Sequence, residues 1–219
     1  MIRAEQKPLS EVEALLGDAE RVLVLGCGTC VAVCFAGGEK EARTLAGALR
    51  VATKIHGRPR AVRHGVVQRQ CETEFVREVE DDVAWADLVV STACGIGCQV
   101  MNECYSDKLT VPGVNTSFLG APTEHGVFEE RCQACGDCIL SSTGGICPIA
   151  RCAKSMLNGP CGGSQGGKCE VNKQTPCAWQ LIYDRLAALG QLAKLEEIQP
   201  LRDWSTSYAG GPRKVTTEP

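Results

Sequence analysis

The stretch RVLVLGCGTCVAVC, residues 21–34, joins a strong strand signal to an unusual loop. Residues 21–26 are a continuous apolar run rich in β-branched side chains, which is typical of a strand buried on both faces of a parallel sheet. Gly26 and Gly28 then supply the G-x-G of a dinucleotide-binding loop, but Val31 stands at the third glycine position and cysteines fill the loop. Because thiolates would repel a pyrophosphate, we expect no nicotinamide nucleotide site here.

Strand and helix patterns alternate on both sides of this stretch. Apolar residues recur at helical spacing in EKEARTLAGALRVATKI, residues 39–55, which predicts a crossover helix. Further strands are expected at 60–68, 87–92 and 108–115, and further helices at 9–20, 72–86 and 97–105. This alternation predicts right-handed βαβ units and therefore an α/β fold with a doubly wound, mostly parallel sheet over residues 20–118.

The character of the chain changes near residue 120, so we divide it into an α/β domain (1–120), a cysteine-rich module (121–199) and a tail (200–219). GAPTEHG at 120–126 has the composition of a loop. The module has many cysteines and glycines but little apolar periodicity, so a bound group must organise it. Apolar helical spacing returns in 177–192 and predicts a closing helix, and the tail is expected to be an extended arm.

Cysteine is the exceptional residue, with 15 among 219 residues. The start of the chain lacks the order of a secretory signal, so we expect a cytoplasmic protein, in which thiols are more often metal ligands than disulfide partners. The net charge of -3 provides no basic field for nucleic acid. No run of 18 apolar residues exists, so we expect no membrane insertion.

One group of cysteines follows the predicted strands. Because the carboxyl ends of adjacent parallel strands lie side by side, we expect Cys27, Cys71 and Cys94 to converge on one crevice. With either Cys30 or Cys34 they would form a tetrathiolate site with one thiol spare. The alternative is that some of these thiols are small buried hydrophobes, and this interpretation applies most to Cys98 and Cys104.

A second group begins in RCQACGDCILSSTGGICP, residues 131–148. Three thiols on one tight loop suit a [4Fe–4S] cluster, whereas zinc more often takes two separated C-x2-C pairs. Eight residues precede the Cys-Pro element where a bacterial ferredoxin has three, so a two-cluster ferredoxin fold is not supported. The candidate ligands are Cys132, Cys135, Cys138, Cys147, Cys152, Cys161, Cys169 and Cys177.

These eight thiols make two sets of four, or one cluster plus one zinc, and the sequence leaves their pairing open. Arg151 and Lys154 are expected either to offset the charge of a thiolate-bound cluster or to be solvated surface side chains. With the first group, the chain would hold two or three [4Fe–4S] clusters, with zinc possible at one site.

GVFEERCQACGDCILSSTGGICPIARCAKSMLNGPCGG at 126–163, with GKCEV and CAWQLIYDRL after it, resembles the cysteine-rich C-terminal module associated with methylenetetrahydrofolate reductases. TGGICP and NGPCGG are its specific motifs. With GCGTCVAVCFAGGEKE and STACGIGCQ ahead of it, the whole chain resembles the small iron–sulfur subunits of the reductases of acetogenic bacteria.

This resemblance implies a non-catalytic electron-transfer subunit that relays electrons from a donor protein to the flavin of a separate, barrel-shaped catalytic subunit. That partner would reduce methylenetetrahydrofolate to methyltetrahydrofolate, in the methyl branch of the reductive acetyl-CoA pathway. Two other hypotheses come from the residues: a zinc-stapled module that organises a partner enzyme, and an enzyme that uses the crevice at residues 27, 71 and 94. The last lacks an evident acid, base or nucleophile.

Overall fold

The computed structural model describes residues 1–217 and divides into two compact units, which are considered separately below. The first unit is Met1–Phe128 and the second begins at Glu129. Among residues 1–217, none of the helices combines the length and the apolar character that crossing a bilayer requires.

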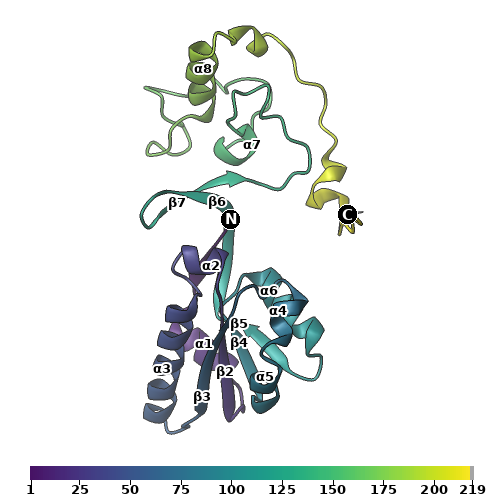
Figure 1. The fold of residues 1–219 in the computed structure, drawn as a ribbon. Helices are drawn as coiled ribbons and strands as arrows, with labels where there is room; N and C mark the ends of the chain where they lie inside the picture. Colours follow the sequence, from purple (N-terminus) through teal and green to yellow (C-terminus); the bar gives the residue numbers. More distant parts are fainter. Residues whose placement is uncertain (218–219) are drawn as a thin grey trace. The chain divides into compact units, whose positions relative to one another are not determined.

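A four-stranded parallel sheet forms the centre of the first unit, as the alternation of strands and helices predicts (Figure 1). Its strands lie in the order β3-β2-β4-β5. They are β2 (Arg21–Cys27), β3 (Ala61–Val67), β4 (Leu88–Ser91) and β5 (Leu109–Pro112). The chain leaves β2 toward β3 on one side and later returns to place β4 on the other side. The sheet therefore reverses its direction of growth between β2 and β4, and such a switch point opens a crevice at the carboxyl ends of the strands.

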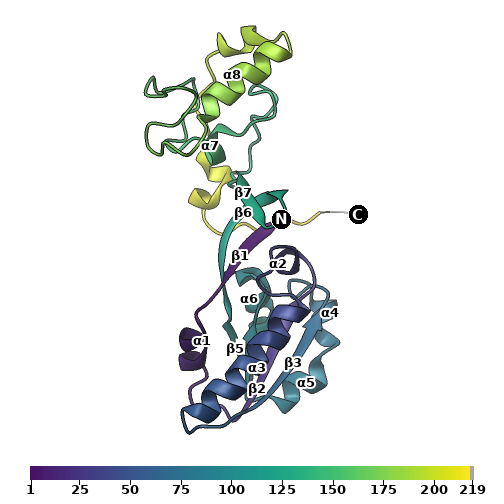
Figure 2. The same cartoon turned by 90° about the vertical axis from the view of Figure 1, so that its left-hand side faces the viewer.

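Helices cover both faces of this sheet (Figures 1 and 2). Helices α1 (Leu9–Leu15) and α3 (Glu39–Ile55) bury their apolar sides in one core with side chains of β2 and β4. On the other face lie α4 (Thr73–Arg77), α5 (Glu80–Trp85) and α6 (Gly95–Cys104). This is the doubly wound arrangement of a mixed α/β fold.

Two of the expected helices differ from the observed ones. The single helix predicted over 72–86 is broken into α4 and α5 at Glu78 and Val79. Three acidic residues occupy the first turn of α5, where the positive end of the helix dipole favours a helix start. Helix α1 ends at Leu15 rather than near residue 20, because Gly17 takes a left-handed φ of +52°.

A second, antiparallel sheet was not predicted. It contains β1 (Ile2–Gln6), β6 (Val114–Glu124) and β7 (Val127–Cys132) in the order β1-β6-β7. The expectation that 120–126 is a loop is therefore wrong for 120–124, which continue β6. Most of β6 is exposed or half-buried, so it carries no continuous apolar run, and its pairing with β1 stabilises it instead.

Regular structure is sparse in the second unit, as its composition predicts. It contains α7 (Pro148–Arg151), α8 (Ala178–Ala188) and the 3-10 turns η1 (Leu192–Leu195), η2 (Trp204–Thr206) and η3 (Tyr208–Gly210). Its buried core is Trp179, Ile182 and Leu186 of α8, with Cys152 and Cys177 packed against them. The tail was expected to be an extended arm, but residues 204–210 form two turns.

Candidate metal centres

Three cysteines of the first unit stand at the carboxyl ends of neighbouring strands. Cys27 is the last residue of β2, Cys71 lies in the segment after β3, and Cys94 precedes α6 in the segment after β4. Desolvation raises the pKa of the Cys71 thiol, and the nearby Cys27 and Cys94 raise this pKa further. Cys27 and Cys94 are therefore close enough to Cys71 to act on its charge, and all three follow strands that meet at the switch point of the sheet.

Gln70, which sequence reasoning missed, holds the segment that carries Cys71. Its side chain is fully buried and donates from Nε2 to the carbonyl oxygens of Leu25 and Gly26, at 2.8 and 3.0 Å. Ser91 at the end of β4 donates its hydroxyl to Gln70 Oε1 at 2.6 Å. One amide side chain thus ties the ends of three strands together next to the thiols.

The fourth candidate ligand was left open between Cys30 and Cys34. Cys34 is buried in the same apolar cluster as Cys27 and Cys94, but its Sγ contacts β1, where it accepts from the backbone N of Ala4 at 3.5 Å. Cys30 begins the short helix α2 (Cys30–Val33) and is only half-buried. Both Cys30 and Cys71 act on the pKa of Arg69, which Glu72 raises most strongly. This placement favours Cys30 as the ligand and Cys34 as a packing residue.

Cys98 and Cys104 lie on α6 and make contacts typical of structural thiols. Cys98 is buried, with its Sγ 3.6 Å from the carbonyl oxygen of Thr110, and desolvation raises its pKa. Cys104 is half-buried and lies 3.9 Å from the hydroxyl of Thr73. Neither position changes the interpretation of these two as small, packed side chains.

In the second unit the structure brings four of the eight cysteines to one cavity. The cavity is small, about 20 Å³, and charged side chains also line it. The four are Cys152, Cys161, Cys169 and Cys177. Distant stretches of sequence meet here, so the pairing that the sequence left open becomes a specific hypothesis: these four form one set, and Cys132, Cys135, Cys138 and Cys147 form the other.

Charge around this cavity suits thiolates. Backbone N–H groups of Asn172 and Val171 lower the pKa of Cys169, and Lys154 lowers it further. Arg151 and Lys154 both line the cavity, and Lys154 forms an ion pair with Glu170. Burial lowers the pKa of Arg151, with Arg131 as a second cause.

The other group begins at the end of β7. Cys132 and Cys138 are exposed, whereas Cys135 and Cys147 are half-buried. Cys132 Sγ accepts from the backbone N of Ala134 at 3.3 Å, and Cys147 directly precedes α7. Cys135 is contacted by Arg202 of the tail, which donates from Nη2 to Sγ at 3.0 Å.

Two of the thiols stand at the start of longer helices. Cys94 is the N-cap residue of α6, which has 10 residues, and Cys177 is the N-cap of α8, which has 11. The free N–H groups at a helix N-terminus can donate hydrogen bonds to the sulfur of a bound metal–thiolate centre.

Within residues 1–217, no group of three or more Cys, His, Asp or Glu side chains is arranged to hold a metal ion. The chemistry of the donor sets nevertheless fits a soft metal, because each group offers four thiols and iron–sulfur clusters and zinc both bind thiolates.

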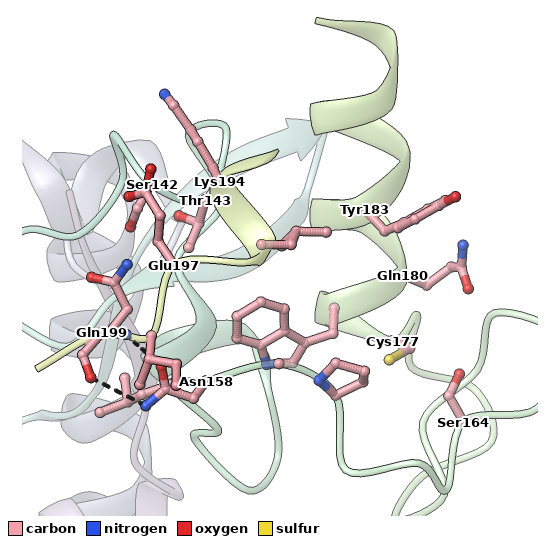
Figure 3. Close-up of a pocket in the computed structure, with 16 residues that line it drawn as sticks. Ser142, Thr143, Asn158, Ser164, Cys177, Gln180, Tyr183, Lys194, Glu197 and Gln199 are labelled. Carbon is pink, nitrogen blue, oxygen red and sulfur yellow. Dashed lines mark hydrogen bonds between the residues drawn. The ribbon is translucent and has the colours of Figure 1, made fainter. Parts of the chain in front are cut away.

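Another cavity, of about 380 Å³, is lined in part by Cys177, which also lines the small cavity (Figure 3). Gln180 and Tyr183 of α8 line one side, together with Cys177 at the N-cap of that helix. On the other side the Gln199 backbone N donates to Asn158 Oδ1 at 2.7 Å. Since the Asn158 amide bonds within the chain, the cavity presents mainly apolar walls next to Cys177.

Residues 111–205 match the model of the family described as methylene-tetrahydrofolate reductase C terminal. The matched segment contains all eight cysteines of the second unit and Arg202. No curated protein and no solved structure matches the chain. Over residues 111–205 the chain is therefore similar to the methylene-tetrahydrofolate reductase C-terminal family.

Proposed function

We propose that the protein is the small iron–sulfur subunit of a methylenetetrahydrofolate reductase of the kind found in acetogenic bacteria. It would work in the cytoplasm and relay electrons from a donor protein to the flavin of a separate catalytic subunit, which converts methylenetetrahydrofolate to methyltetrahydrofolate. The observation that carries the proposal is the gathering of Cys27, Cys71 and Cys94 at the switch point of the first unit. The family match of the second unit supports the link to the reductase.

Three sets of four thiols would hold the metal centres. The first is Cys27, Cys30, Cys71 and Cys94; the second is Cys132, Cys135, Cys138 and Cys147; the third is Cys152, Cys161, Cys169 and Cys177. Iron–sulfur clusters bound there would accept and pass on single electrons. Three is therefore the largest number of iron–sulfur clusters in the proposal. Zinc also binds four thiolates, so it could take the place of a cluster in one set.

The chain's own contribution is to hold the thiols together and keep them charged. Gln70 fixes the segment of Cys71 against β2 and β4, and Cys94 stands at the N-cap of α6, beside free backbone N–H groups. In the second unit the backbone N–H groups near Cys169 and the side chain of Lys154 lower the pKa of that thiol. Such hydrogen bonds and charges around sulfur also tune the potential of a bound cluster.

A second candidate function is a zinc-stapled module that organises a partner enzyme. The small core of the second unit favours it, because three buried side chains of α8 give that unit little apolar burial of its own. A structural metal would supply the missing folding free energy.

Purification of the full chain under anaerobic conditions tests both candidates. We expect a brown protein with iron, acid-labile sulfide and a reducible visible absorption, and we expect it to copurify with a flavoprotein. Cys94→Ser should lose part of the iron, whereas Cys104→Ser, its matched control on α6, should keep all of it. A colourless protein containing only zinc would replace the electron-transfer role with the structural one.

A further inference from the structure

The tail of the chain packs on the loop that carries Cys135. Thr206 donates from its hydroxyl to the carbonyl oxygen of Cys135 at 2.9 Å, and Arg202 donates from Nη2 to the Cys135 sulfur at 3.0 Å. The same guanidinium contacts the carbonyl oxygen of Asp137 and lies 3.5 Å from its carboxylate. Residues more than 60 positions apart in the sequence therefore hold one cysteine by both its backbone and its side chain.

Arg202 is buried to an unusual degree for an arginine. Its side chain is 4% exposed, and its guanidinium lies 5.1 Å from the ring centroid of Trp204. Nε is buried and has no hydrogen-bond partner in the part of the chain that the structure describes. Burying a charged group with an unused donor is costly unless something else accepts from it. An anionic group bound at Cys135 would supply that acceptor.

Gly136 shows how closely the tail approaches. Its φ is +82°, and a Cβ built on it would lie 2.1 Å from the carbonyl oxygen of Thr206. No side chain fits between the loop and the tail at this distance. The absence of a side chain at residue 136 is therefore a condition for the contact, independent of the arginine.

We propose that residues 202–207 form a cap on the cysteine loop, and that Arg202 is the positioning residue that holds the Cys135 thiolate for a soft, anionic metal–thiolate centre. The inference rests on the proposed function for its ligand. The cap itself does not, because the contacts of Thr206 and Gly136 involve only the chain. A cationic donor at the sulfur would favour the more negative, reduced form of a redox centre.

The cap can be tested whatever metal the protein holds. Limited trypsin digestion of the purified full chain should cut after the exposed Arg213 and Lys214 but leave the bond after Arg202 intact. Gly136→Ala should speed cleavage after Arg202 by about tenfold or more, because proteolysis follows the opening of the segment. Gly145→Ala is the matched control: Gly145 has a similar φ of +86° but nothing within 4 Å of its Cβ position. Equal cleavage after Arg202 and Arg213 in the unmodified protein would overturn the cap.

The role of Arg202 needs a second measurement. Arg202→Gln should release metal to a chelator several times faster and, if the centre is redox-active, lower its midpoint potential. Arg202→Lys keeps the charge but not the planar guanidinium, so its rate of metal release and its midpoint potential should lie between those of the unmodified chain and of Arg202→Gln. It also keeps a trypsin site, so resistance to cleavage at residue 202 shows that the tail is still docked. An Arg202→Gln chain with unchanged metal release and unchanged potential would overturn the positioning role, and so would a docked Arg202→Lys chain with the same result. If the purified chain contains no metal, both the proposed function and the proposed ligand of Arg202 are wrong. The trypsin digestion would still show whether residues 202–207 form a cap.

Discussion

The hydroxyl of Ser91 lies 2.6 Å from Oε1 of Gln70, and both side chains are fully buried at the carboxyl edge of the parallel sheet. Gln70 uses its amide nitrogen on Leu25 and Gly26, so this contact completes a link between β2, the segment after β3, and β4. Cys71 is the next residue along the chain. The position of one candidate ligand therefore depends on a buried polar network that contains no metal ligand itself.

Replacing Gln70 by Ala should weaken the first thiol group more than the fold. The Ser91 hydroxyl would lose its acceptor and the Gly26 carbonyl would lose a donor, whereas the Leu25 carbonyl keeps the backbone N–H of Thr92. Each buried polar group left unsatisfied costs about 1–3 kcal/mol. We expect a lower melting temperature and a partial loss of metal from the full chain. Gln68→Ala is the matched control, because the side chain of Gln68 lies at an exposed position two residues earlier. Equal metal content in the two variants would contradict this role of Gln70.

The two candidates for the fourth ligand of the first group can be separated by removing each thiol. Cys34→Ala should retain the metal content of the unmodified chain, because its sulfur contacts the backbone of Ala4 in β1. Cys30→Ala, one helical turn earlier, should lose metal from this group. Iron, zinc and sulfide analysis of both variants after anaerobic purification measures the difference. Metal loss on removal of Cys34 alone would reverse the assignment.

The helices and strands that could be predicted are those whose own sequence pattern shows which of their faces are buried. Residues 21–26 are apolar without interruption because both faces of β2 are covered, and 39–55 shows a helical stripe because one side of α3 is buried. β1 and β6 carry no such signal. Most of their residues are exposed or half-buried, and their strand conformation depends on a partner more than 100 residues away in the chain.

The candidate site likewise has a part that could be predicted from the sequence and a part that could not. The meeting of Cys27, Cys71 and Cys94 follows from the rule that parallel strands share a carboxyl edge, so it could be predicted from the strands alone. The grouping of Cys152 with Cys169 could not, because it depends on the path of a loop with many left-handed glycines. The contact between Arg202 and Cys135 had no sequence signal either, since a single arginine in a polar tail resembles an ordinary surface residue.

Asp87 gives a pH-dependent contribution to the stability of the first unit. Arg21 bonds to its carboxylate at 2.6 Å and, with the backbone N–H of Arg21, lowers the Asp87 pKa to about 2. Since the unfolded value is about 3.9, this contribution is complete above about pH 4 and is lost as the pH falls through about 2. We expect Asp87→Asn to melt at a lower temperature than the unmodified chain at pH 7, and the difference to close near pH 2.

Thermal unfolding of both chains at the two pH values measures this effect. Acid-driven loss of metal affects both chains alike and cancels in the difference between them. Asp82→Asn is the control, because Asp82 lies 3.8 Å from Arg63 in a looser, exposed pair. A difference between Asp87→Asn and the unmodified chain that is as large at pH 2 as at pH 7 would show that the carboxylate charge is not the cause.

Removing the metal should affect the two units differently. The first unit has extensive apolar cores on both faces of its sheet, whereas the second has a core of three α8 side chains. Chelation under anaerobic conditions should therefore abolish amide protection in 133–177 while β2 and β4 keep theirs. Hydrogen exchange followed by mass spectrometry measures both regions in one sample. Unchanged protection of 133–177 would mean that the second unit folds without a metal.

The division of the eight cysteines of the second unit predicts how paired substitutions combine. Cys161 and Cys169 line the same cavity, so Cys161→Ser and Cys169→Ser should each remove the same metal centre, and the double variant should lose no more metal than either one alone. Cys161→Ser combined with Cys138→Ser should instead remove two centres, and the losses should add. Metal analysis of the three single and two double variants, with the unmodified chain measured in parallel, compares the two pairs directly. If the metal losses of Cys161→Ser and Cys169→Ser add, while those of Cys161→Ser and Cys138→Ser do not, the grouping taken from the cavity is wrong. Cys161 would then share a metal centre with Cys138.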